Sequence, residues 1–247
     1  MNGLVIGEEV ESRMFILDDA SPFGIDLPED LISLLKRNNK LKILDAEKLA
    51  EDLYLLTEEV DEPVTVLGNG GALVMALLSR LGYRPDFNLV GIERRYGNSD
   101  GRTIIDFEIT RSADPRQRLV DDVIASAGTI NYAIRELGID EPEALALLIS
   151  GDRRSQFREE YGSTVRNVSG VTAARSVCWK SGYPAILSAR FLLKKVRDDP
   201  GYGKYLSRYV NGQIDDVRAM VDRMDLGPFD LLYENPDGFI KQFGGSI

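Results

Sequence analysis

The amino-acid sequence predicts an α/β fold in which a parallel sheet is flanked by helices. Short segments rich in Val, Ile and Leu alternate with segments whose apolar residues recur at helical spacing, and glycine-containing turns separate the two. This alternation is typical of parallel sheets with helices on both faces. The chain has 247 residues and a hydrophobic fraction of 43%, which is enough for a sizeable core.

The N-terminal segment, residues 1–62, contains two predicted strands, each followed by a helix. Residues 13–17 predict a strand, and residues 27–35 predict a helix with Asp and Glu in its first turn. Residues 41–44 predict a second strand, and leucines at helical spacing predict a helix over residues 45–56. This segment is a candidate hood or lid over the core.

The central core is predicted to begin with a β-branched strand over residues 63–67. Residues 68–71 read Gly-Asn-Gly-Gly and predict a turn. The helix expected over residues 72–81 is apolar on most faces, which indicates that it is buried.

A hairpin is expected next, between strands at residues 88–92 and 103–109. Residues 96–102 between them are polar and contain glycine, which predicts a turn. The glycine-rich turns of the core follow strands, and ligands of parallel sheets bind at the carboxyl ends of the strands.

The third core strand is predicted at residues 118–123 and ends in a small-residue turn at 125–129. Apolar residues of segment 130–137 then recur at i, i+3, i+4 and i+7, which predicts a helix. Residues 145–149 predict a fourth strand, and residues 164–168 are a candidate fifth.

The pattern changes to helices and loops from about residue 174. We therefore divide the chain into the N-terminal segment 1–62, a core over residues 63–173 and a helical C-terminal region over residues 174–247. We expect the helical region to serve as an oligomer interface or lid, and we expect a homodimer.

Composition excludes several classes of site. The sequence has no histidine and a single cysteine, so it has no internal disulfide, no Ser-His-Asp triad and no histidine-bound zinc. A net charge of −10 argues against nucleic-acid binding. No apolar run approaches the ~20 residues that span a membrane, and the first ten residues do not resemble a signal peptide. We expect a cytoplasmic protein.

The most informative stretch, residues 119–129, reads Leu-Val-Asp-Asp-Val-Ile-Ala-Ser-Ala-Gly-Thr. Backbone N–H groups of a small-residue turn and of the helix that follows can close around an anion, and Ser126 and Thr129 add hydroxyl donors. Asp121 and Asp122 can accept hydrogen bonds from vicinal sugar hydroxyls. The pattern indicates a phosphate site beside a sugar site, with ordinary strand–turn–helix punctuation as the alternative.

The same stretch resembles the signature of type I phosphoribosyltransferases, in which apolar residues, an acidic pair and a Thr-, Ser- and Gly-rich turn occur in this order. The resemblance covers about residues 63–170 and implies a phosphoribosyltransferase-like sheet. It implies that Asp121 and Asp122 contact the ribose hydroxyls and the metal. The residues that it implies at the 5-phosphate are Ala125, Ser126, Ala127, Gly128 and Thr129.

The turn after the first core strand takes a role from the same resemblance. Its residues Asn69, Gly70 and Gly71 would bind pyrophosphate through backbone N–H groups, and Asn69 stands where the family has a basic residue. A simple turn is the alternative.

The resemblance also assigns the basic side chains around the predicted hairpin. Arg94, Arg95 and Arg102 would neutralise charge on the leaving pyrophosphate, and residues 96–102 would form a short flexible loop that closes over the site and excludes water. A solvated hairpin is an equally good interpretation of this segment. Asp152 would be a metal or water-shell ligand, with a helix N-cap as the alternative.

The function implied is that of a Mg²⁺-dependent phosphoribosyltransferase. It would move 5-phosphoribose from 5-phosphoribosyl 1-pyrophosphate to an acceptor nitrogen, in our interpretation a nucleobase, and release pyrophosphate. The alternative is a non-catalytic regulator that binds the same sugar pyrophosphate or a nucleotide. Ala127, where glycine is common, and the missing basic residue in the first turn favour this alternative.

Overall fold

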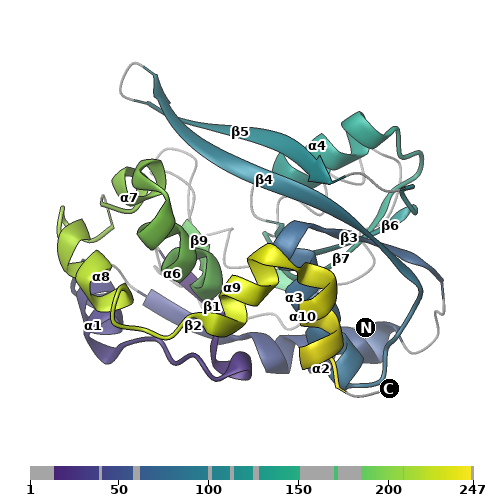
Figure 1. Cartoon of the computed structure of the whole chain (residues 1–247), viewed down its shortest axis with the longest axis horizontal. Coiled ribbons are helices and arrows are strands. Elements are labelled where there is room, and N and C mark those ends of the chain that lie inside the picture. The colour runs from purple at the N-terminus through teal and green to yellow at the C-terminus, as the bar shows by residue number, and fades with distance from the viewer. Residues whose placement is uncertain are drawn as a thin grey trace.

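The computed structural model describes residues 14–38, 41–57, 62–99, 102–111, 114–124, 128–150, 170–171, 185–207 and 209–245. Over these ranges the chain forms two sheets flanked by helices (Figure 1). The strands are β1 (Met14–Asp18), β2 (Leu41–Asp45), β3 (Val64–Leu67), β4 (Phe87–Ser99), β5 (Arg102–Arg111), β6 (Arg118–Ile124), β7 (Glu143–Ser150), β8 (Gly170–Val171) and β9 (Ala185–Ser188). The helices are η1 (Ser21–Phe23), α1 (Glu29–Asn38), α2 (Ala46–Thr57), α3 (Gly68–Arg80), α4 (Gly128–Leu137), α6 (Ala189–Asp198), α7 (Pro200–Ser207), α8 (Ile214–Val221), α9 (Gly227–Glu234) and α10 (Pro236–Phe243).

The larger sheet confirms the predicted α/β fold class. Its strand order is β5-β4-β3-β6-β7-β8, and every neighbouring pair is parallel except the antiparallel pair β4 and β5. The chain leaves β3 toward β4 on one side and returns with β6 on the other side. Such a reversal of strand order opens a crevice at the carboxyl ends of the two strands, where ligands of open α/β sheets bind.

A second, smaller sheet joins the two ends of the chain. Its order is β2-β1-β9, and both pairs are parallel, with Ile16 opposite Ile43 on one side and Leu187 on the other. The prediction of only helices and loops after residue 174 therefore missed β9. This strand has four residues and passes directly into α6, so it is too short to show the alternation that marks a strand.

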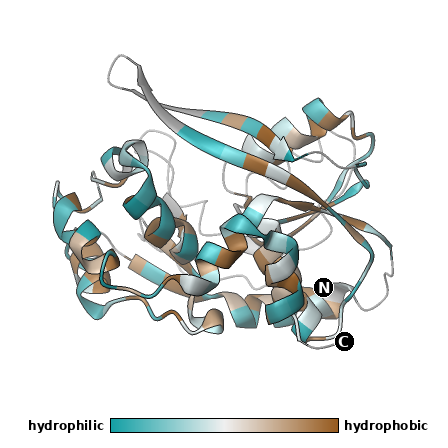
Figure 2. Ribbon diagram, in the orientation of Figure 1, coloured by the Kyte–Doolittle hydropathy of each residue, from teal (hydrophilic) through white to brown (hydrophobic). Residues whose placement is uncertain are grey.

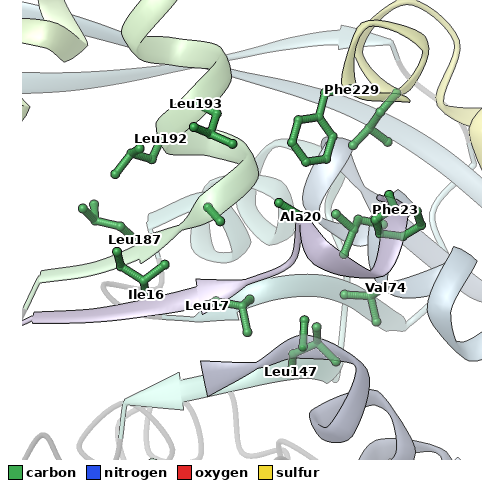
Figure 3. Packing of buried hydrophobic residues seen from close by; sticks show 14 of the residues in the cluster. Ile16, Leu17, Ala20, Phe23, Val74, Leu147, Leu187, Leu192, Leu193 and Phe229 are labelled. Atoms are coloured by element: carbon green, nitrogen blue, oxygen red, sulfur yellow. The ribbon is translucent and has the colours of Figure 1, made fainter. Parts of the chain in front are cut away.

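One hydrophobic core holds both sheets together (Figure 3). Ile16 and Leu17 of β1 pack with Leu193 of α6, and the same cluster includes Val74 of α3 and Leu147 of β7. The N-terminal and C-terminal regions thus share buried apolar surface with the larger sheet. This shared core fixes the position of α6 relative to β6, on which the site depends.

The turn predicted at residues 68–71 is wrong, because these residues form the first turn of α3. The strand β3 passes into the helix without a loop. Gly68 makes this possible because it adopts φ +55°, in the left-handed region that favours glycine. The prediction failed because Gly-Gly normally marks a loop rather than a helix.

The hairpin is confirmed, but it is longer than the sequence predicts. Pairing of β4 with β5 continues out to Ser99 opposite Arg102, so residues 96–99 are strand and the predicted flexible loop over residues 96–102 is wrong for this part. Figure 1 shows the resulting ribbon running across the molecule. Hydrophilic and hydrophobic residues follow one another along it (Figure 2), as in a strand with one covered face.

Two predictions concern residues that are not all described. The candidate strand at 164–168 lies outside the described residues, whereas β8 pairs with β7 a few positions further on. Within the described ranges, no helix is both long enough and apolar enough to cross a membrane.

Candidate functional site

The acidic pair lies on β6, just beyond the last residue of β6 that pairs with β3. Asp121 and Asp122 are 3% and 4% exposed, so both carboxyl groups are buried. The N–H of Asp122 donates to Oδ1 of Asp121 (2.9 Å), and the N–H of Val123 donates to Oδ1 of Asp122 (2.8 Å). Since β3 pairs with β6 only as far as Val120, these carboxylates satisfy amides where the ladder with β3 has ended.

Helix α3 packs directly against this pair through its glycines. A Cβ at Gly70 would lie 2.5 Å from Oδ1 of Asp122 and 2.9 Å from Oδ1 of Asp121, and a Cβ at Gly71 would meet the carbonyl oxygen of Val120. Only glycine fits at these positions without displacing the carboxylates or the strand. The structure therefore brings two of the predicted pyrophosphate residues to the acidic pair, while Asn69 lies half-buried in the same turn.

Arg94 supplies positive charge that acts on both carboxyl groups of the pair. It lies on β4, and its Nε donates to the hydroxyl of Thr129 (3.0 Å) in the first turn of α4. Its guanidinium also lies 5.6 Å from the ring centroid of Phe191, within reach of a cation–π interaction. The predicted residues Arg94 and Thr129 are thus brought together at the start of a helix.

The other two predicted basic residues, Arg95 and Arg102, lie at other positions on the hairpin. Arg95 follows Arg94 along the strand and is exposed, and it forms an ion pair with Glu108 on β5. Successive side chains of a strand point to opposite faces, so Arg95 cannot share the position of Arg94. Arg102 pairs with Ser99 in the ribbon, and its side chain is outside the described part of the structure.

Four predicted residues lie outside the described ranges. They are Ala125, Ser126, Ala127 and Asp152. The turn that would hold the 5-phosphate is therefore represented by Gly128 and Thr129, which begin α4.

Arg190 on α6, to which the sequence analysis assigned no role, is the strongest partner of the acidic pair. Its Nη2 donates to Oδ2 of Asp122 at 2.6 Å, and Arg190 is only 4% exposed. The same guanidinium donates through Nε to Asp19 (3.4 Å) and through Nη1 to the hydroxyl of Tyr233 (3.3 Å). Arg190 therefore connects β6 with the end of β1 and with α9.

Asp19 anchors this arginine from the smaller sheet. It is fully buried, accepts from the hydroxyl of Ser188 (2.6 Å) and accepts from the backbone N–H of Arg190 (2.8 Å). Ser188 in turn caps α6 by accepting from the N–H of Phe191. One sequence signal pointed to this contact: Arg190 lies three positions before Leu193 on the buried face of α6, and a charge on an apolar face indicates a buried ion pair.

The surroundings of the pair shift the pKa values of its two carboxyl groups in opposite directions. Burial, and then the charge of Asp122, raise the pKa of Asp121 well above its usual value. Burial also acts to raise the pKa of Asp122, but the guanidinium groups of Arg190 and Arg94 outweigh it, so that this pKa is lowered. Asp122 is therefore the ionised member of the pair, and Asp121 is the member that holds a proton more readily.

One acceptor of the pair is open. Oδ2 of Asp121 is buried and has no hydrogen-bond partner among the described residues, whereas Asp122 accepts from Val123 through Oδ1 and from Arg190 through Oδ2. Buried polar atoms are almost always paired, so an unpaired carboxyl oxygen indicates a place for a polar group of a ligand. A sugar hydroxyl, which can donate or accept a hydrogen bond, is such a group.

The surroundings of Asp122 disfavour a magnesium ion bound directly to this carboxylate. Mg²⁺ binds through one or two carboxylates and keeps several waters, but the guanidinium of Arg190 already lies 2.6 Å from Oδ2 of Asp122 and would repel a dication there. No group of three acidic, histidine or cysteine side chains that could hold a metal occurs in the described part of the chain.

No protein-family model matches the chain, and no curated protein matches it. Three solved structures illustrate the likenesses found. A hypothetical protein from Neisseria gonorrhoeae with bound ppGpp has 17% identity and a TM-score of 0.33 over 56% of this chain and 72% of its own. A hypoxanthine-guanine phosphoribosyltransferase from Bacillus anthracis has 18% identity and a TM-score of 0.35, and the match covers 52% of this chain and 78% of the other. A hypoxanthine phosphoribosyltransferase from Staphylococcus aureus has 15% identity and a TM-score of 0.31, and the match covers 49% of this chain and 73% of the other.

Proposed function

We propose that this chain binds 5-phosphoribosyl 1-pyrophosphate between β3 and β6 and transfers its phosphoribosyl group to an acceptor nitrogen of a nucleobase. The observation that carries the proposal is the buried pair Asp121 and Asp122, with one unpaired acceptor, beside the first turn of α4. A sugar hydroxyl and a phosphate are the two ligand groups that this arrangement suits.

The phosphate would lie at the start of α4. The first N–H groups of a helix have no partner within the helix and carry its positive dipole end, so they attract an anion. Thr129 lies in the first turn of this helix, and Arg94 reaches it from β4. A phosphate here would meet the positive end of the helix dipole and the charge of Arg94 together.

The ribose would lie against Asp121. Its unpaired Oδ2 would form a hydrogen bond with a ribose hydroxyl, which can donate to the carboxylate or accept from the protonated carboxyl, and this bond removes the cost of a buried unpaired polar atom. The ionised Asp122 lies directly beside it. Negative charge at the sugar stabilises the positive charge that develops on the ring as the leaving group departs.

The transfer exchanges one bond at the anomeric carbon for another. The bond from C1 to the pyrophosphate oxygen breaks, and its electron pair leaves with pyrophosphate. The lone pair of the acceptor nitrogen forms the new bond to C1, and the acceptor then loses its proton to water. Magnesium belongs to this proposal as an ion carried by the ligand's own pyrophosphate, and none of these steps places it on the acidic pair.

One observation favours the second candidate, a regulator that binds the same ligand without turnover. Asp122 already holds Arg190, which leaves a single open acceptor where a catalytic site would use two carboxylates on the ribose. Release of pyrophosphate separates the candidates, because a regulator binds the ligand and releases none. The predicted homodimer is part of both candidates, and sedimentation would measure it.

Calorimetric titration with 5-phosphoribosyl 1-pyrophosphate tests the binding site. We expect Asp121→Asn to weaken binding about tenfold or more, since it replaces half of the acceptors with an amide donor. Asp106→Asn is the matched control, because Asp106 is exposed on β5 and its loss should leave the affinity unchanged. A folded wild-type chain that binds no sugar pyrophosphate would contradict the proposal.

A further inference from the structure

The position that a cation would take beside the acidic pair is already filled from within the chain. Nη2 of Arg190 lies 2.6 Å from Oδ2 of Asp122, so a divalent ion at this oxygen would lie against a buried guanidinium of like charge. The remaining oxygen of Asp122 accepts the N–H of Val123. The positive charge beside Asp122 therefore comes from Arg190 and opposes a metal ion there.

Arg190 is also held in place by three separate elements. Asp19 at the end of β1 accepts from its Nε and from its backbone N–H, Tyr233 of α9 bonds to Nη1, and Asp122 of β6 accepts from Nη2. A side chain fixed at this many points keeps little rotamer freedom. Moving it away would leave the carboxylates of Asp19 and Asp122 buried without a counter-charge, which is costly.

The charges around the pair balance without a metal. The ionised carboxylates of Asp19 and Asp122 both pair with the guanidinium of Arg190, and the charge of Arg94 acts on Asp122 as well. Asp121, next to Asp122, adds no further charge while it keeps its proton. An additional dication would leave an excess of positive charge in a buried site, where charge is expensive.

We propose that Arg190 takes the place of a divalent cation at the acidic pair, so that this site binds the ribose phosphate part of its ligand without a metal ion. The choice of ligand rests on the proposed function, whereas the position of Arg190 does not. The proposal changes the expected cofactor: magnesium would enter only with a ligand that carries its own pyrophosphate.

Ribose 5-phosphate is the probe that separates the two sources of metal dependence. It has the phosphate and the sugar hydroxyls but lacks the pyrophosphate that would itself chelate the ion. We expect its dissociation constant for the wild-type chain to agree within about twofold between buffer with Mg²⁺ and buffer with a chelator, which is a negligible difference in binding free energy. Binding that vanishes when the metal is removed would overturn the proposal.

Titration with Mn²⁺ alone tests the role of Arg190 without any sugar ligand. We expect wild type and Asp122→Asn to bind Mn²⁺ equally by electron paramagnetic resonance, because Asp122 holds no metal. We expect the double variant Arg190→Gln/Asp19→Asn, which removes one charge of each sign, to gain a Mn²⁺ site that disappears when Asp122→Asn is added.

Each outcome decides a different question. A Mn²⁺ site in the wild type that is lost with Asp122→Asn would overturn the proposal, and so would a folded double variant that gains no site. If the double variant does not fold, the comparison of Mn²⁺ binding by wild type and Asp122→Asn still shows whether Asp122 holds a metal. A wild-type chain that binds no ribose phosphate in either buffer would contradict the proposed function, while the Mn²⁺ titration would still test Arg190.

Discussion

Arg190 and Asp122 form a buried ion pair, with 2.6 Å between Nη2 and Oδ2, although they are far apart in the sequence and lie on different elements of the molecule. Asp122 lies on β6 of the larger sheet, and Arg190 begins the helix that follows β9 of the smaller sheet. The C-terminal region is therefore a part of the candidate site. It is also fixed there by Asp19, which comes from the N-terminal segment.

A double-mutant cycle should show strong coupling between these two residues. We expect Arg190→Gln alone to lower the free energy of unfolding by about 3 kcal/mol or more, because it leaves Asp122 charged and unpaired. Asp122→Asn should then cost much less in the Arg190→Gln background, which corresponds to a coupling of about 2 kcal/mol in urea denaturation.

The control for this cycle uses Glu143, the partner of a buried arginine on β6. Arg118 is 4% exposed and bonds to Glu143 (2.8 Å) at the opposite end of the strand. Arg190→Gln combined with Glu143→Gln should be additive within about 0.5 kcal/mol. Equal coupling in both cycles would show general destabilisation rather than a specific pair.

Stability should fall as pH rises through the titration of Asp19. Burial, opposed by Arg190, raises the pKa of this carboxyl from 3.8 to about 6. A raised carboxyl pKa favours folding when the group is protonated, so its contribution is complete below pH 4 and is lost as pH rises through 6. The loss corresponds to about 3 kcal/mol.

Urea denaturation at pH 4.5 and 7.5 measures this effect. We expect the difference in unfolding free energy between wild type and Asp19→Asn to shift by about 2 kcal/mol in favour of the variant at the higher pH, since the unfolded carboxyl is already largely ionised at pH 4.5. Asp26→Asn serves as a control, because Asp26 is exposed, and it should keep the wild-type pH dependence. A wild-type profile in Asp19→Asn would show that Asp19 does not titrate in this range.

Local signals explain which parts of the fold could be predicted from the sequence. The β6 strand and the acidic pair lie in one continuous stretch, where two apolar residues on each side of Asp121 and Asp122 mark a buried strand. Arg94 and Thr129 were predicted individually from their places after a strand and before a helix. Their hydrogen bond is a tertiary contact between β4 and α4.

The parts of the fold and of the site that could not be predicted from the sequence depend on contacts between distant segments. No local sequence pattern predicts that β9 pairs with β1, or that Arg190 contacts Asp122. These partners are far apart in the sequence and come together only when the shared core packs. Gly70 and Gly71 were read as a loop because glycine weakens helices. Their real role is close packing of a helix on β6, which a sequence pattern does not reveal.

Gly70→Ala should disturb the site directly. The added Cβ would lie 2.5 Å from Oδ1 of Asp122, so either the carboxylate or α3 must move. We expect a loss of about 1–3 kcal/mol in unfolding free energy, as for an overpacked core, together with weaker binding of 5-phosphoribosyl 1-pyrophosphate. Gly227→Ala is the control, since its Cβ would meet only the side chain of Asp225 at 3.2 Å. Equal stability of the two variants would contradict this packing.

Neighbouring arginines on β4 should differ sharply in their effect on ligand binding. Arg94 points to Thr129 at the start of α4, whereas Arg95 is exposed and paired with Glu108. Because the phosphate would receive the charge of Arg94 only, we expect Arg94→Met to weaken binding of 5-phosphoribosyl 1-pyrophosphate by about tenfold or more. We expect Arg95→Met to change it by less than about twofold, since a surface ion pair contributes little.

Calorimetric titration of both variants at fixed salt makes the comparison. Adjacent positions on one strand are a close match, because both substitutions remove one positive charge and change the net charge of the chain equally. A similar loss in both variants would mean that the ligand responds to overall charge, and the phosphate would then not lie at α4. A loss confined to Arg94→Met would support the phosphate position, because only this arginine reaches the helix start.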